Sequence, residues 1–316
     1  MHFVASSLPL FGMMSTWLKP LWLVVAGVLI AVVVLAVFNM LLRWVAPKVA
    51  AIGWTTSKEA MAQPLFALLL AIGIFGIIIF PFVPYNTLGE DIKMVKDEGL
   101  TLIMVLSMLM ALWTASVSIA DEIEGRTALT VLSKPVSRRQ FVLGKFVGIL
   151  TPVAIMFVVF GALFLASVSY KVVYDARETA EIEPGWESCR NEMLQITPGL
   201  GLAFMETIVM AAISVAISTR LPMLANLSIC ASIYVLGHLL PILANSAVGQ
   251  NEFVGFVASL LAAILPVLDH FNISAGISTG QWVPMEYLLW AVLYCVLYSV
   301  VAMLLALLLF EDRDLA

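Results

Sequence analysis

Charged side chains are scarce in this sequence: Asp, Glu, Lys and Arg make up 12% of the 316 residues, about half their share in an average soluble domain. Hydrophobic residues make up 62%, and the mean hydropathy is +1.05. A water-soluble fold has no interior large enough for this apolar surface, so we expect the chain to lie in a lipid bilayer. The net charge of −5 does not favour binding to the negatively charged phosphate backbone, so nucleic acid is not an expected partner.

Cysteine and histidine are also rare, which excludes the common metal sites. The three cysteines, Cys189, Cys230 and Cys295, form no CxxC pair, so neither a disulfide framework nor a zinc site is indicated. The three histidines form no HExxH motif, which excludes that metalloprotease chemistry. We therefore expect no metal and no resident cofactor.

A nucleotide-binding motif is missing as well. The Walker pattern requires a glycine five residues before Gly144-Lys145, and Arg139 stands there instead. No segment between the apolar runs is long enough for a nucleotide-binding domain, so any ATP must be bound by another chain. Residues 276–280 match the GxSxG pattern of hydrolases, but they follow a short apolar helix rather than a strand, so a plain turn is expected.

Long apolar runs are what the sequence does have, and they predict an all-α polytopic membrane protein. A helix needs ~20 mainly apolar residues to cross the hydrocarbon core. Seven runs qualify: Pro20–Leu42, Pro64–Pro84, Leu100–Ala120, Phe141–Tyr170, Leu200–Thr219, Pro222–Ser246 and Met285–Phe310. An eighth run, Phe253–Leu268, is short for a crossing, so we expect a re-entrant segment there.

Basic residues in two loops set the expected orientation. The segment 121–140 carries Arg126, Lys134, Arg138 and Arg139, and the segment 43–63 carries three further Lys or Arg residues. By the positive-inside rule both are cytoplasmic, which places the loops 85–99 and 171–199 outside.

Two capping boxes lie in these cytoplasmic segments. Residues 56–59 (TSKE) predict a short surface helix that begins at Thr56 and ends before Pro64. Residues 137–140 (SRRQ) predict that Ser137 caps the fourth crossing. Arg138 and Arg139 would then occupy a first helical turn, where the helix dipole disfavours cations, so another role is expected, such as binding a lipid phosphate or an acidic side chain of a partner.

The segment 120–149, ADEIEGRTALTVLSKPVSRRQFVLGKFVGI, combines both charge signs with a short amphipathic stretch close to the bilayer. Such a segment suits docking onto a cytoplasmic protein, although an ordinary positively charged loop has a similar composition. The residues that we expect to make the contact are Glu122, Glu124, Arg126, Thr127, Lys134, Pro135, Arg138 and Arg139.

This segment resembles the loop between core helices two and three of type-2 ABC exporter permeases. That family shows an acidic ExE, a Thr, LSKPVSR and FxLGK, which correspond here to Glu122, Glu124, Thr127, 132–138 and 141–145. Weaker similarities are Leu265-Pro266 with His270-Phe271 and Gly276, and the end of the chain, 310–315.

The resemblance covers residues 46–315 and implies a six-helix core, a surface helix before it, a dimer of permeases and an ATPase on a separate chain. The expected organisation is therefore an extra transmembrane helix in residues 1–45, followed by a permease domain, 46–316, with a coupling loop at 121–140. The expected function is ATP-driven export or extraction of a substrate from the membrane, and the expected location is the bacterial inner membrane. A secondary transporter and a membrane scaffold without an ATPase are the alternatives.

Two ionisable residues lie well inside the predicted crossings, Glu206 and His238. Such residues are costly in lipid and usually face a partner or a wet cavity. The fifth and sixth crossings form a tight hairpin around Arg220, and counting from that turn places the two residues at similar depths. We expect them to approach each other in the outer half of the membrane and to line the substrate exit. The alternative is that each binds a local backbone carbonyl or serine.

Overall fold

The computed structural model describes residues 15–85, 87, 90–120, 136–179, 182, 184–245, 252–273, 276–277 and 280–311. Every regular element that these residues form is a helix, so the predicted all-α class is confirmed. The elements are η1 (Thr16–Leu21), α2 (Trp22–Val45), α3 (Pro47–Ala62), α4 (Pro64–Ile79), η2 (Phe80–Phe82), α5 (Asp91–Ala115), η3 (Ser116–Ala120), α8 (Arg138–Glu178), α9 (Trp186–Ser218), α10 (Met223–Asn245), α11 (Glu252–Ile264), η5 (Leu268–Phe271) and α13 (Met285–Glu311).

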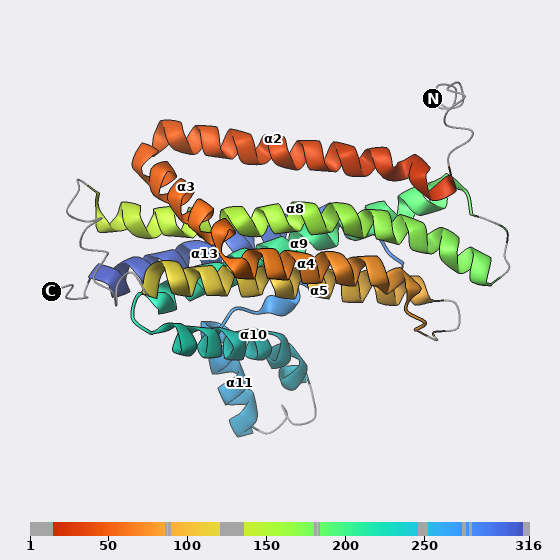
Figure 1. The fold of residues 1–316 in the computed structure, drawn as a ribbon. Coiled ribbons are helices and arrows are strands. Elements are labelled where there is room, and N and C mark those ends of the chain that lie inside the picture. Colours follow the sequence, from red (N-terminus) through yellow and green to blue (C-terminus); the bar gives the residue numbers. More distant parts are fainter. Residues whose placement is uncertain are drawn as a thin grey trace.

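Seven helices in the described part of the chain are long and apolar enough to cross a membrane, and they coincide with the seven predicted runs. Helices α5, α8 and α9 supply most of the buried core, and α13 packs against α9. Figure 1 shows α2 as an outlying helix beside α8, while α10 and α11 lie on the other side of the bundle. No residue of α2 is buried, so this extra helix stands outside the core.

The helices α5, α8 and α9 extend well beyond the apolar runs at the end of the bundle that the basic residues predict to be the outer end, where loops are predicted. Helix α8 has 41 residues and is therefore about 60 Å long, twice the ~30 Å of the hydrocarbon core. Ion pairs between helices stabilise these extensions, as in the contact of Lys96 on α5 with Glu192 on α9. The prediction of open loops at 85–99 and 171–199 is therefore wrong for most of their length.

The surface helix before the second crossing is α3, and its predicted start is wrong. It begins at Pro47 rather than Thr56, because proline at the first position and the break at Ala46 already start the helix. Thr56 is buried against α8, so it caps nothing. The close approach depends on Gly148 of α8, where an added Cβ would lie 2.6 Å from the Thr56 Cβ and 2.8 Å from the Gly53 oxygen.

Helix α11 occupies the eighth apolar run. Its 13 residues span about 20 Å, too little for the hydrocarbon core, as the sequence indicates. It packs against α10 and is followed by the single turn η5. That α11 enters the membrane and returns stays a prediction.

Cysteine labelling tests the orientation, but not through a native cysteine. Cys189 lies in the first turns of α9 and is buried, as are Cys230 and Cys295, so the reagent needs an introduced cysteine at an exposed position. Ile182 is 96% exposed between α8 and α9, and Glu59 is exposed on α3. We expect a membrane-impermeant maleimide to label Ile182→Cys in intact cells, and Glu59→Cys only after permeabilisation. The reverse pattern would overturn the orientation, and the unsubstituted chain is the blank.

Candidate functional site

The predicted coupling loop joins η3 to α8, and six of its candidate residues lie outside the described residues: Glu122, Glu124, Arg126, Thr127, Lys134 and Pro135. Both flanks of this segment are described. Figure 1 shows that the end of α5, the start of α8, the end of α13 and the turn from α9 to α10 gather at one end of the bundle. The elbow between α2 and α3 lies at the same end. The segment 121–135 is therefore attached where most of the long helices meet.

The flank after the segment is fixed by a capping box and by Arg138. The Ser137 Oγ accepts a hydrogen bond from the Gln140 backbone and the Gln140 side chain binds the Ser137 N–H, as predicted. The Arg138 guanidinium donates to the carbonyls of Phe310 (3.0 Å) and Glu311 (2.7 Å), the last residues of α13.

Arg138 therefore satisfies open carbonyls at a helix C-terminus, where the dipole favours a cation. This gives Arg138 a role inside the chain, and its binding of an external phosphate or acid stays a prediction. Its neighbour Arg139 is exposed at the same end of α8, so the expectation of an outside partner still applies to that residue.

The flank before the segment is held by a buried amide. Ser116 begins the π-helical turn η3, and its Oγ lies 2.7 Å from the Asn226 Nδ2 of α10. The same Nδ2 lies 2.8 and 2.9 Å from the hydroxyls of Ser214 and Ser218 on α9. All four side chains are buried. We call these residues the Asn226 cluster. It connects η3, which leads directly into the coupling segment 121–135, to α9 and α10.

Glu206 and His238 meet as the sequence indicates. The His238 Nε2 lies 3.5 Å from the Glu206 Oε1, and Glu206 is only 2% exposed. They line a cavity of about 180 Å³ between α5, α9, α10 and η5. Its other described lining residues include the polar Asp97, Thr101, Tyr234 and Asn272. That this cavity is a substrate exit stays a prediction.

The contact of His238 with a backbone carbonyl determines which ring nitrogen faces Glu206 without a proton in the neutral ring. The Nδ1 lies 3.1 Å from the Tyr234 carbonyl oxygen, which accepts only, so Nδ1 carries the proton. In the neutral ring, Nε2 then presents a lone pair to Glu206. The contact is favourable only when the pair holds one further proton, on the imidazole or on the carboxyl group. Without it, two acceptors face each other.

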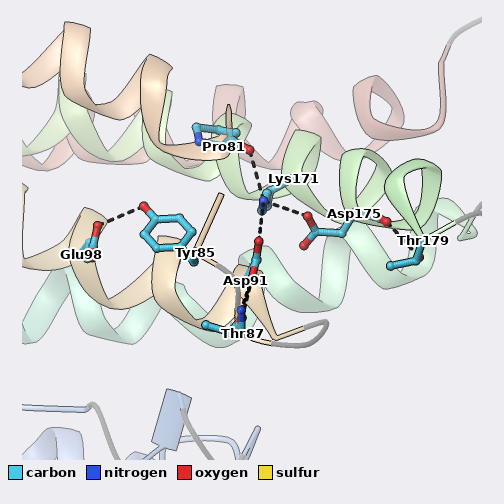
Figure 2. Close-up of polar contacts among 8 residues, drawn as sticks. All are labelled: Pro81, Tyr85, Thr87, Asp91, Glu98, Lys171, Asp175 and Thr179. Carbon is cyan, nitrogen blue, oxygen red and sulfur yellow. Dashed lines mark hydrogen bonds and ion pairs between the residues drawn. The ribbon is translucent and has the colours of Figure 1, made fainter. Parts of the chain in front are cut away.

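A second ion cluster lies at the outer end and was not predicted from the sequence (Figure 2). The Lys171 Nζ of α8 lies 2.8 Å from Asp175, 3.8 Å from Asp91 of α5, and 3.2 Å from the Pro81 carbonyl of η2. Lys171 is 1% exposed, and both acids are partly exposed. The three partners come from separate elements, so Lys171 holds the outer ends of η2, α5 and α8 together.

We expect Lys171→Met to lower the free energy of unfolding by about 2–3 kcal/mol, because removing one member of a buried ion pair leaves its partners unpaired. Lys93→Met is the matched control: Lys93 pairs with Glu90 at the surface, with 33% and 63% of the two side chains exposed, and such pairs contribute ~0–1 kcal/mol. Thermal unfolding of the purified variants in detergent measures both. Equal melting temperatures would contradict a structural role for Lys171.

The sequence carries little signal for the two features that were missed. Ser214 and Ser218 are four residues apart and so share a face of α9, but serine is common in membrane helices, and only the fold brings Asn226 to them. Lys171 appears in the sequence at the end of an apolar run, where a lysine usually reaches into water. Among the described residues, no group of His, Cys, Asp and Glu is arranged to hold a metal ion.

Comparison with known families gives one match that covers almost the whole chain. The profile of the family described as ABC-2 family transporter protein matches residues 14–315. No curated protein matches the chain significantly. The chain therefore belongs to the ABC-2 transporter family, as its resemblance to type-2 ABC permeases indicated, and it is a membrane transport protein of that family.

Proposed function

We propose that this ABC-2 family member is the permease subunit of an ATP-driven exporter, and that a separate ATPase subunit binds its cytoplasmic segment 121–135. One observation carries the proposal: both ends of this segment are tied to the helix bundle by specific contacts, the first buried and the second partly exposed. Ser116 in the Asn226 cluster anchors one end, and Arg138 at the end of α13 anchors the other. A loop that served only to connect two helices has no need of such anchors.

The anchors indicate how a movement would spread. In this proposal, ATP-dependent closure of two ATPase subunits displaces the segment 121–135. The displacement reaches α9 and α10 through Asn226, and it reaches α13 through Arg138. Because α9 and α10 carry Glu206 and His238, the same movement changes the cavity in the outer half of the membrane, as alternating access requires.

The assembly that follows contains two permeases and two ATPases in the cell membrane, a bacterial inner membrane in this proposal. ATP is bound by the ATPase subunits, and this chain contributes no cofactor of its own. A large apolar surface is available for a second permease. One face of α13 exposes five apolar side chains, those of Leu289, Trp290, Leu293, Val296 and Leu297. A face of this kind packs against lipid or another membrane helix.

Co-purification from native membranes tests the proposal. We expect an affinity-tagged chain, extracted in mild detergent, to carry with it a polypeptide that contains Walker motifs and hydrolyses ATP. The chain purified without that polypeptide should hydrolyse none. Recovery of an active transporter without any ATPase would instead favour a secondary transporter.

A further inference from the structure

The cavity that contains Glu206 has the composition of a binding site for a cation. Two acids, Asp97 of α5 and Glu206 of α9, line it, and none of its described lining residues is Lys or Arg. The aromatic rings of Tyr234 and Phe271 line it as well, and such rings attract cations over their faces. Asp269 of η5 adds a further negative charge that acts on Glu206.

One atom in the cavity lacks a hydrogen-bond donor. The Glu206 Oε1 is buried and accepts no hydrogen bond from any described residue. The His238 Nε2, at 3.5 Å, lies beyond the usual N–H···O range of 2.7–3.2 Å. A buried carboxylate oxygen without a donor is costly, because it loses water and gains nothing in return. The oxygen is therefore available to a ligand that brings its own N–H donor.

The size of the cavity limits what that ligand is. Its volume of about 180 Å³ is below the ~300–1,000 Å³ of pockets that enclose whole drug-sized molecules. It is large enough for a head group. Asn272 lines the cavity and is exposed, so the cavity reaches the surface at that point. A ligand with a small cationic head inside the cavity and an apolar tail in the surrounding lipid meets both conditions.

We propose that the cavity binds the primary ammonium head group of an amphiphile. This proposal rests on the proposed export function, because it names the class of molecule that is exported. The ammonium donates to the Glu206 Oε1 and takes the place of the further proton that a favourable contact between Glu206 and His238 requires. That proton leaves to water, so one positive charge replaces another and no net charge is added to the membrane interior. Asp97, His238 and Tyr234 line the same cavity, and its described lining includes no ionisable residue of α13.

Binding to the full-length chain in bilayer discs of zwitterionic lipid tests this, with decylammonium as the probe and decanol as the uncharged probe with the same tail. Titration calorimetry should show saturable binding of decylammonium, while decanol should behave as it does with empty discs. Glu206→Gln should weaken decylammonium binding by about tenfold or more, because it removes the charge-assisted hydrogen bond. Glu187→Gln is the matched control, because Glu187 is exposed on the same helix, outside the cavity.

Equal binding of decylammonium and decanol by the unsubstituted chain would overturn the proposal, whether or not the variant folds. Undiminished binding of decylammonium to a folded Glu206→Gln chain would overturn it too. The assay contains no ATPase and no ATP, so its failure would leave the proposed coupling untouched. Conversely, absence of an ATPase partner would not alter the binding result.

Discussion

Reversing the charges of Glu122 and Glu124 to lysine is expected to reduce ATP-driven transport at least tenfold while the chain still inserts and folds. The two acids lie in the segment that we propose binds the ATPase, and lysines there would reverse the electrostatic complementarity that this proposal requires. Insertion should be unaffected, because added lysines in a cytoplasmic loop reinforce the positive-inside orientation. Transport by the complex in vesicles, normalised to the amount of chain in the membrane, measures the effect.

Glu187→Lys is the control for this experiment. It makes the same charge change at an exposed glutamate in the first turn of α9, at the opposite end of the bundle from the coupling segment. Transport by this variant should stay close to that of the unsubstituted chain. If the double variant transports as well as the control, Glu122 and Glu124 have no part in coupling and merely solvate the loop.

Replacing Gly148 with valine is expected to cost about 3 kcal/mol or more of folding free energy. Helix α3 crosses α8 at this glycine, and even one added carbon would overlap Thr56 and the Gly53 carbonyl. Overpacking of this kind usually costs 1–3 kcal/mol, and valine adds three carbons where backbone limits relaxation. The melting temperature of the detergent-purified chain and its elution as a single species measure the change.

Gly201→Val provides the comparison for Gly148. Gly201 is exposed on α9, and an added Cβ there has no neighbour within 4 Å. The same substitution should therefore leave the melting temperature nearly unchanged. If Gly148→Val also left the melting temperature nearly unchanged, the α3–α8 crossing would tolerate a larger residue than its geometry implies.

The transmembrane helices could be predicted from the sequence because their signal is local. Each run of ~20 apolar residues is sufficient for one crossing, and all seven appear in the structure. The predicted helix ends were less accurate where contacts with residues distant in the sequence determine how far a helix extends. The contact between Lys96 and Glu192 stabilises the extensions of α5 and α9 beyond the apolar runs. These two residues are 96 positions apart, so no local sequence pattern predicts their contact.

The same distinction applies to the candidate site. Glu206 and His238 could be paired from the sequence because they belong to consecutive helices joined by a tight turn, so counting from Arg220 fixes their relative depth. The Asn226 cluster could not, because it also requires Ser116, 110 residues earlier in the chain. The roles of the acids and basic residues in 121–135 remain predictions, since these residues lie outside the described part of the structure.

Site-specific cross-linking from the coupling segment tests the central claim most directly. A photoactivatable amino acid at Thr127, in the middle of the segment, should cross-link in native membranes to a polypeptide that carries Walker motifs. The same group at Ile182, at the outer end of the bundle, should give no such product. Cross-links from Thr127 to lipid alone, or to a protein without a nucleotide-binding domain, would contradict the account that ATP hydrolysis on a separate subunit drives this chain.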